Sequence, residues 1–480
     1  MLLAAVLWAA ATMALYCAPP AKDNIWPVIY IVGQFLYLFG FLVVLYFLTR
    51  PVNWVSEATE GLTPADMPLI IMAYPVLRED ADTMHTTMVA LSRQDYPAGK
   101  FRVIAIPNSH DTVTIEALTR LQSEFQFLEI MEVPPTTDPS WDAVWQSWAA
   151  NPKSYWFHEG KTRSVTDLPP KKTRQLIYLL YTLRARIGTD WVLSYIDADS
   201  LVPANHFKLA ALGLKRYDVL QSTNVVGNLL DTWGVTFHGF DHMVWDGNIY
   251  PHSSANGKHP YYVLGKGLFY QAAQLVEVGG FNPWTTIEDP EVGMRLWTNG
   301  KRLGIIREPL IEESPPTISG GIVQRNRWMC GFYQSLGAPL RQMGMGFWDR
   351  QKARLNAMPT VLLLTNIFGL PTGAYALYRF ITCTGIFDLW VVYLSLVNIG
   401  LAVIILTQMY TVTFRRTRLV LNRLSQRLWY MIRVSPLFLV TYYLIWCIPI
   451  LVGFGMYLSG RGKVWMRTEK FDADSRFVKH

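Results

Sequence analysis

The stretch Trp191-Val192-Leu193-Ser194-Tyr195-Ile196-Asp197-Ala198-Asp199 decides the fold of the central part of the chain. Its first six residues are mostly apolar, β-branched or aromatic, which is typical of a buried strand. In an extended segment residues i and i+2 project to the same side, so Asp197 and Asp199 can face one cation at the end of the strand. Hard divalent ions such as Mg²⁺ take oxygen ligands and bridge protein carboxylates to substrate phosphates. An acidic turn that caps the next helix is the alternative interpretation.

A second acidic stretch, Thr285-Thr286-Ile287-Glu288-Asp289-Pro290, precedes a predicted helix. Acidic residues at a helix N-terminus are ordinary caps, because the helix dipole favours negative charge there. A carboxylate in such a loop can also reach a bound hydroxyl group and accept its proton. The residues alone leave both interpretations open.

The pentapeptide Gln324-Arg325-Asn326-Arg327-Trp328 lies between these acidic motifs and a run of apolar segments. Helical pitch places Gln324, Arg327 and Trp328 on one face, at i, i+3 and i+4. That face offers an amide, a permanent cation for phosphate and a flat surface for a sugar ring. The alternative is an amphipathic interface helix whose basic side meets lipid head groups.

The composition indicates a membrane protein. Of the 480 residues, 51% are hydrophobic and only 16% are charged, which is more apolar than ordinary soluble proteins. The net charge of +7 is best explained by contacts with lipid and diphosphate groups, and no nucleic-acid motif is visible. Apolar stretches of membrane length are predicted at Val28 to Leu48, Thr360 to Tyr378, Leu389 to Tyr410 and Pro436 to Leu458, and Met1 to Ala18 is a further candidate.

The order of these motifs resembles the catalytic domain of membrane-integrated family 2 glycosyltransferases, which include cellulose, hyaluronan and chitin synthases and several glycolipid-forming enzymes. The resemblance covers about Met67 to Tyr333. Pro75-Val76-Leu77-Arg78-Glu79 resembles the turn after the family's first strand. Lys172-Thr173-Arg174-Gln175-Leu176 resembles a helix start of the family, although Gln175 and Ile177 depart from the family pattern. The Gln-x-x-Arg-Trp core is present without substitution.

The resemblance implies a GT-A-like (Rossmann-like) α/β cytoplasmic glycosyltransferase domain embedded in an α-helical transmembrane domain. It implies an inverting transfer in which Asp289 is the general base and Glu288, Gln324 and Trp328 hold the acceptor. Asp199 would bind Mg²⁺ or Mn²⁺. The residues that it assigns to the nucleotide-sugar donor are Pro75, Glu79, Asp111, Lys172, Asp197 and Arg327.

One departure concerns the donor base. Many relatives carry an acidic turn after the second strand, whereas this chain has Pro107-Asn108-Ser109-His110-Asp111. Asp111 or Asn108 can substitute, and an ordinary Asn/Ser/Asp turn is the alternative. The resemblance favours a UDP-sugar over a GDP-sugar as donor.

A second departure concerns processivity, because the gating loop of cellulose synthase is not recognisable after the Trp motif. The predicted function is transfer of a hexose-type sugar to a growing polysaccharide, with translocation of the product through the membrane helices as one version. The alternative is a non-processive enzyme that glycosylates a membrane lipid. A third hypothesis is a catalytically inactive membrane scaffold or transporter.

The sequence also predicts how the chain is divided into domains and how it is oriented in the membrane. The stretch 413–433 carries six arginines and no acidic residue, so the positive-inside rule places it and the catalytic domain on the cytoplasmic side of the cytoplasmic membrane. The segment from Arg341 to Arg354 alternates basic and large apolar residues, which is typical of an interfacial helix. The predicted units are an N-terminal transmembrane hairpin (1–50), a catalytic domain (51–335), an interfacial region (336–358), C-terminal transmembrane helices (359–458) and a basic tail (459–480).

A histidine-rich stretch contains His238, His242, His252 and His259. Only His238 and His242 have the i, i+4 spacing of a helical zinc site. Roles in a loop or in an acceptor pocket explain these histidines better, and nearby Trp233 and Trp245 can line a sugar-binding groove.

Overall fold

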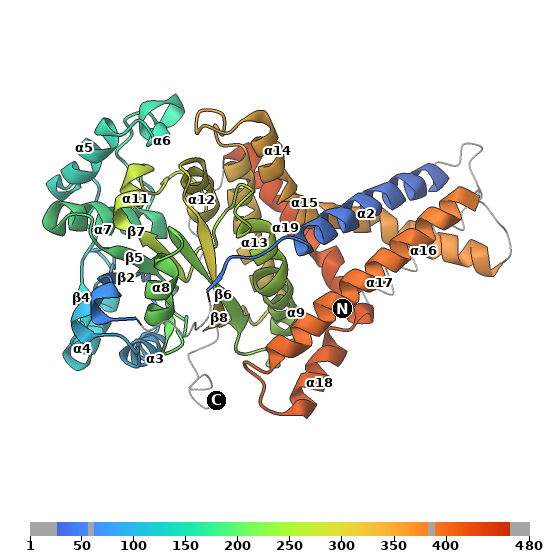
Figure 1. Cartoon of the computed structure of the whole chain (residues 1–480), viewed down its shortest axis with the longest axis horizontal. Coiled ribbons are helices and arrows are strands. Elements are labelled where there is room, and N and C mark those ends of the chain that lie inside the picture. Colours follow the sequence, from blue (N-terminus) through green and yellow to red (C-terminus); the bar gives the residue numbers. More distant parts are fainter. Residues whose placement is uncertain (1–25, 56–61, 383–388, 461–480) are drawn as a thin grey trace.

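The computed structural model describes residues 26–55, 62–382 and 389–460. In this part of the chain an α/β unit lies beside an arm of long helices (Figure 1). The predicted Met1 to Ala18 span, and the basic tail after Gly460, lie outside the described residues.

The α/β unit is built on one eight-stranded sheet with the order β1-β8-β6-β7-β5-β2-β3-β4. All neighbouring strands pair in parallel except β7, which is antiparallel to both β5 and β6. The predicted strand before Asp197 is β5, and every residue in it is buried. The strands are β1 (Trp54–Val55), β2 (Ile70–Tyr74), β3 (Phe101–Ala105), β4 (Leu128–Ile130), β5 (Val192–Tyr195), β6 (Val219–Val226), β7 (Leu268–Gln271) and β8 (Leu303–Glu312).

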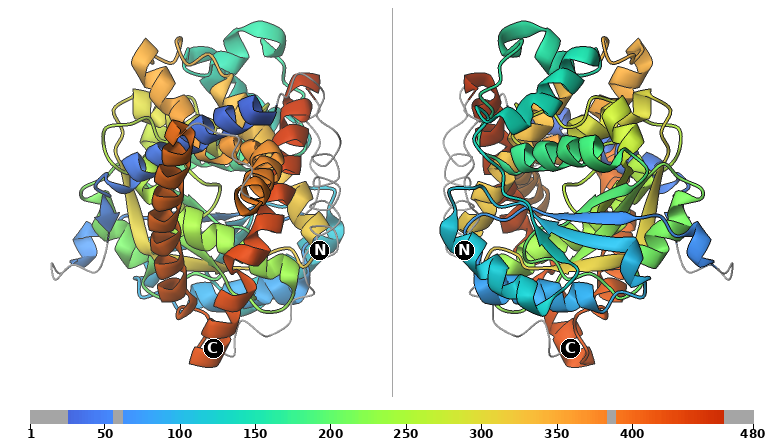
Figure 2. Two further views of the ribbon diagram at one scale, coloured as in Figure 1. Left: turned by 90° about the vertical axis from the view of Figure 1, so that its right-hand side faces the viewer. Right: turned by 90° about the vertical axis from the view of Figure 1, so that its left-hand side faces the viewer.

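Helices cover both faces of the sheet (Figure 2). They are α3 (Ala81–Ser92), α4 (Thr112–Glu124), α5 (Asp142–Ala150), α6 (Tyr155–His158), α7 (Lys172–Ile187), α8 (His206–Leu214), α9 (Trp233–Asp241), α10 (Tyr250–Ser254), α11 (Ala272–Glu277) and α12 (Asp289–Thr298). A π-helical segment, η5 (His242–Ile249), continues α9, and short 3₁₀ turns are η1 (Pro64–Asp66), η2 (Ala98–Lys100), η3 (Pro139–Trp141) and η4 (Gly160–Thr162).

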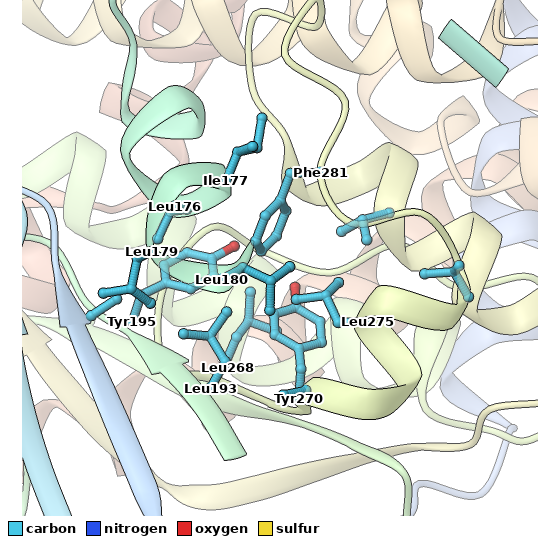
Figure 3. Packing of buried hydrophobic residues seen from close by; sticks show 14 of the residues in the cluster. Leu176, Ile177, Leu179, Leu180, Leu193, Tyr195, Leu268, Tyr270, Leu275 and Phe281 are labelled. Atoms are coloured by element: carbon cyan, nitrogen blue, oxygen red, sulfur yellow. The ribbon is translucent and has the colours of Figure 1, made fainter. Parts of the chain in front are cut away.

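A buried hydrophobic cluster packs α7 against the centre of the sheet (Figure 3). Leu180 of α7, Leu193 of β5 and Tyr270 of β7 belong to this cluster, and all three side chains are buried. Each fully buried leucine contributes about 1.5–3 kcal/mol relative to an exposed one. This packing holds α7, and therefore the loop that precedes it, against the end of β5.

The remaining helices form the arm and its base. Helices α13 and α19 lie at the base, whereas α2, α16 and α17 extend away from the sheet (Figure 1). They are α2 (Trp26–Leu48), α13 (Ile318–Leu336), α14 (Phe347–Leu355), α15 (Met358–Val361), the 3₁₀ turn η6 (Leu362–Thr365), α16 (Asn366–Ile381), α17 (Leu389–Thr417), α18 (Leu424–Arg433) and α19 (Pro436–Ser459).

Three helices in the described ranges are long and apolar enough to cross a membrane: Val28–Leu48, Leu389–Thr417 and Pro436–Ser459. They match three of the predicted apolar stretches. The stretch Thr360 to Tyr378 is not among them, because it is divided between α15, η6 and α16 and contains Pro371 within α16. Proline removes a backbone donor and interrupts a regular helix.

Candidate active site

The sheet brings separate sequence motifs to one edge. Strands β2 and β5 are parallel and Ala73 pairs with Tyr195, so the turn at Pro75 and the acidic pair after β5 emerge side by side. Strand β7 runs the opposite way, and its first residue, Leu268, also pairs with Tyr195. The loop that precedes β7 therefore lies at the same edge.

A cavity of about 670 Å³ opens at this edge, between the sheet and the arm helices. It brings together both acidic motifs and the Gln-x-x-Arg-Trp face. The predicted site residues that line it are Pro75, Glu79, Lys172, Asp197, Asp199, Glu288, Asp289, Gln324, Arg327 and Trp328.

Lys172 connects two sides of the cavity. Its Nζ donates to Asp197 Oδ1 at 2.7 Å and to the Gly265 carbonyl at 2.8 Å. Burial alone would lower the pKa of Lys172, but Asp197 and Glu288 raise it overall, so the side chain stays cationic. The first residue of α7 thus holds the Asp-x-Asp turn and the loop before β7 together.

The carboxylates of Glu288 and Asp289 lie close together at the start of α12. Thr173 Oγ1 donates to Glu288 Oε2 at 3.4 Å. Burial, and then the neighbouring Glu288 carboxylate, raise the pKa of Asp289 well above its usual range. A Cβ on Gly265 would lie 3.3 Å from Asp289 Cγ, so glycine lets the loop pass close to this carboxyl group. A carboxylate with a raised pKa is a stronger base.

The pentapeptide lies on α13, which Thr317 caps by accepting from the Gly320 amide at 3.0 Å. Gln324, Arg327 and Trp328 all line the cavity, as helical pitch predicts. Burial lowers the pKa of Arg327, whereas Asp197 acts in the opposite direction.

Asp111 is the predicted site residue that does not line the cavity. It caps α4, where its carboxylate accepts from Thr114 Oγ1 at 2.8 Å and from the Arg78 amide at 3.1 Å. Arg78 has a left-handed backbone, with φ of 51°, so Asp111 supports the turn that carries Pro75. Asn108 is buried and accepts a hydrogen bond from Arg174. Nucleotide binding by Asp111 stays a prediction.

Several cavity residues were not expected from the motifs. Lys266 forms an ion pair with Glu312 at the end of β8, and burial lowers the pKa of the Lys266 ammonium group. Lys171 also lines the cavity and donates to the Thr285 carbonyl at 3.2 Å. The one local sequence feature that could have indicated Lys266 as a site residue is its position between Gly265 and Gly267, because a glycine pair favours a close approach of the backbone.

The cavity continues from the carboxylates into the helical arm, where its wall becomes apolar. On this part of the wall Asp241 accepts a hydrogen bond from Trp446 Nε1 at 3.0 Å, and Tyr37 Oη donates to Asn366 Oδ1 at 2.9 Å. The residues there are Leu36, Tyr37, Gly40, Phe41 and Val44 of α2, Leu362, Leu363 and Asn366 near the start of α16, Ala402, Ile405, Leu406 and Met409 of α17, and Tyr443 and Trp446 of α19.

The donor set suits a weakly held hard cation. Asp197 and Asp199 offer carboxylate oxygens to the cavity, whereas no group of three or more His, Cys, Asp or Glu side chains suited to a metal occurs in the described part of the chain. Mg²⁺ commonly binds through one or two carboxylates and completes its coordination with substrate phosphates and water. The residues therefore fit an ion that arrives with a diphosphate.

Comparison with known proteins gives one family match. Residues 191–458, more than half of the chain, match the model described as "Glycosyl transferase family group 2". No curated protein matches the chain.

Solved structures of similar arrangement share little sequence with this chain. The mannosyltransferase PcManGT from Pyrobaculum calidifontis, in complex with GDP-Man and Mn²⁺, is 14% identical; the match covers 90% of this chain and 98% of that one, with a TM-score of 0.49. S. aureus TarS 1-349, in complex with UDP-GlcNAc, is 12% identical, with 82% of this chain and 92% of that one covered and a TM-score of 0.36.

Proposed function

The chain belongs to glycosyl transferase family group 2, and on that premise we propose that it transfers a hexose-type sugar from a nucleotide-sugar to a membrane-held acceptor, with inversion at the anomeric carbon. The predicted GT-A-like α/β fold is confirmed by the mixed sheet and the family match. The observation that carries the proposal is that Asp197, Asp289 and Trp328 line the same cavity.

The donor diphosphate is proposed to lie between the Asp-x-Asp turn and the cations of the cavity. Lys172 and Arg327 are positioned to offset its charge, and a divalent ion on Asp199 would neutralise the charge that develops on the leaving diphosphate. The predicted preference for UDP over GDP stays a prediction, since Asp111 caps α4 and Asn108 is bonded to Arg174.

Asp289 is proposed as the base of a one-step displacement. The acceptor hydroxyl oxygen forms a bond to the anomeric carbon, the bond from that carbon to the donor phosphate oxygen breaks, and its electron pair leaves with the nucleoside diphosphate. The hydroxyl proton passes to an Asp289 oxygen. A single attack from the face opposite the leaving group gives inversion, and the raised pKa of Asp289 suits it to accept the proton.

The acceptor is proposed to carry an apolar portion, because the cavity wall beyond the carboxylates is formed by apolar side chains of α2 and α17. Both helices are long and apolar enough to cross a membrane. An acceptor lipid could lie along this wall while its hydroxyl group faces Asp289. This arrangement favours a non-processive glycolipid transferase.

Polysaccharide extension is the second candidate. Aromatic side chains follow the cavity from Trp328 past Trp446 to Tyr443. Sugar rings stack on such surfaces, so a growing chain could pass along them. Product size separates the two candidates.

The cytoplasmic membrane is the proposed location, with the catalytic domain facing the cytoplasm. The support is the arginine-rich stretch from the end of α17 through α18, which includes Arg415, Arg423 and Arg427. Lysine and arginine accumulate on the cytoplasmic side of membrane proteins.

The test is a transfer assay with purified full-length protein in membrane-lipid extract, with radiolabelled UDP- and GDP-sugars and Mg²⁺ or Mn²⁺. We expect one labelled, chloroform-soluble product of low mass. A high-mass product that a glycosidase degrades would establish the polysaccharide candidate. Absence of both transfer and donor hydrolysis with every donor would exclude the proposed activity.

A further inference from the structure

A buried histidine–carboxylate pair lies on the cavity outside the predicted motifs. His242 Nδ1 is 2.6 Å from Asp246 Oδ2, one helical turn further along η5. The side chains are only 10% and 9% exposed, and both line the cavity. π-Helical segments occur frequently at functional sites.

The environment of Asp246 determines which nitrogen of His242 carries a proton. Burial would raise the pKa of Asp246, but His242 and Lys266 lower it overall, so Asp246 is a carboxylate and only accepts hydrogen bonds. His242 Nδ1 must therefore donate. Asn224 Nδ2 approaches the same Asp246 oxygen at 3.5 Å, and Arg416 packs against Gly247, the residue that follows Asp246.

The other ring nitrogen, Nε2, can hydrogen-bond a hydroxyl group, because a hydroxyl group both donates and accepts. Among the residues that the structure describes, His242 Nε2 has no hydrogen-bond partner. The pair thus presents one oriented hydrogen-bonding nitrogen on a cavity-lining side chain.

The indole of Trp328 forms the adjacent wall. The rings of His242 and Trp328 are perpendicular, with an interplanar angle of 90° and centroids 6.1 Å apart. An edge-to-face contact of this kind holds the imidazole orientation. A flat indole beside a fixed hydrogen-bonding nitrogen suits a molecule with an apolar ring face and hydroxyl groups at its rim, which describes a carbohydrate.

We propose that His242, oriented by Asp246, hydrogen-bonds a hydroxyl group of a sugar ring stacked on Trp328, so that the acceptor has a sugar head group. This inference rests on the proposed function and specifies its acceptor. His242 is then an acceptor-binding residue, and Asp246 is a positioning residue that acts through it. A bare lipid alcohol would leave both groups unused.

The test compares two probes of equal alkyl length, octyl β-glucoside and 1-octanol, as acceptors for the full-length enzyme in lipid nanodiscs. Release of nucleoside diphosphate without acceptor is measured in parallel, because it reports donor chemistry alone. The variants are His242→Ala, His242→Gln and Asp246→Asn. The control is His85→Gln, which alters an exposed His–carboxylate pair with Glu124 on α3 and α4.

We expect the wild type to prefer the glucoside. His242→Ala should raise the KM for the glucoside by about 3- to 10-fold, the loss of one hydrogen bond, while donor hydrolysis stays unchanged. His242→Gln should restore part of the affinity, because its side-chain amide can hydrogen-bond the same hydroxyl group. Asp246→Asn should raise the KM less than His242→Ala, since Nδ1 keeps an amide partner, and His85→Gln should match the wild type.

Two results would overturn the proposal while leaving the proposed function in place. One is a wild-type enzyme that hydrolyses the donor but does not prefer the glucoside, either because it transfers sugar equally to both probes or because it transfers sugar to neither. The other is a His242→Ala variant that loses hydrolysis and transfer in parallel, or that keeps the wild-type KM. An enzyme without any donor hydrolysis would instead contradict the proposed function itself.

Discussion

Arg325 donates two hydrogen bonds to Asp241, from Nε and Nη2 to the same carboxylate oxygen at 3.1 and 2.7 Å. The Arg325 side chain is 2% exposed and its guanidinium lies 5.4 Å from the Trp328 ring and 5.2 Å from the Trp446 ring. Trp446 Nε1 of α19 also donates to the Asp241 oxygen at 3.0 Å. Asp241 of α9 therefore links α13, the helix that carries the Gln-x-x-Arg-Trp face, to α19 at the base of the arm.

Asp241→Asn should lower the stability of the protein, because it leaves the Arg325 charge buried without a countercharge. Loss of one partner of a buried pair costs about 3–5 kcal/mol. The melting temperature in detergent should fall by several degrees, and transfer activity should fall with it. Asp95→Asn is the control, since Asp95 pairs with Lys208 at the surface, with 68% and 46% of their side chains exposed. Equal melting temperatures for the two variants would contradict a structural role for the buried pair.

Gly453→Ala should separate α13 from α19. A Cβ at Gly453 would lie 2.5 Å from Met329 Cβ and 3.0 Å from the Cys330 amide nitrogen, so the helices must move. The melting temperature and the transfer rate should both fall. Gly455→Ala is a matched control on the same helix, because nothing lies within 4 Å of its Cβ position. If both variants behave as the wild type, the close packing of the two helices is not important for the site.

The residues of the site that the sequence predicts are those whose positions depend on local geometry. Asp197 and Asp199 follow a buried strand, and Gln324, Arg327 and Trp328 share a face at helical spacing, so short-range periodicity is enough to bring each set to the cavity. The position of Lys266 cannot be predicted in this way, because it depends on β7, which lies antiparallel between β5 and β6. The His242–Asp246 pair faces Trp328 only after η5 packs beside α13.

The apolar stretch from Thr360 to Tyr378 illustrates a limit of hydropathy. Apolar composition predicts a membrane-spanning helix, but it does not reveal that the helix is interrupted at η6. Nor does it reveal the hydrogen bond from Tyr37 Oη to Asn366 Oδ1 at 2.9 Å. The end of α17 lies against the α/β unit, because Arg416 Nη2 donates to the Asn224 carbonyl at 2.8 Å, so α17 returns the chain from the arm to that unit.

The activity should rise with pH through the raised pKa of Asp289. The base must be ionised to accept a proton, so activity is lost as pH falls through that pKa, and the acidic limb of the profile should lie above the usual carboxyl range. Glu288→Gln removes the neighbouring charge, so it should lower the pKa and move the limb to lower pH. An acidic limb that does not move would mean that Glu288 is not close enough to influence the base.

Asp289→Asn tests the same group directly. It should reduce turnover by at least 100-fold while donor affinity changes little, because general-base catalysis contributes about 10²–10⁴-fold. Turnover and donor affinity are measured separately, by transfer and by calorimetric titration with the nucleotide-sugar. A variant that keeps a tenth of the wild-type turnover would exclude Asp289 as the sole base.

Removal of the divalent ion should weaken donor binding in the wild type but not in Asp199→Ala. The ion is expected to connect Asp199 to the donor diphosphate, so titrations with a UDP-sugar in Mn²⁺ and in EDTA should differ only while that carboxylate is present. Asp82→Ala, an exposed acidic residue in the first turn of α3, should keep the wild-type difference. If Asp199→Ala also keeps it, the ion is held elsewhere in the cavity. If EDTA changes nothing in the wild type, the diphosphate charge must instead be offset by side chains alone, for which Lys172, Lys266 and Arg327 are in place.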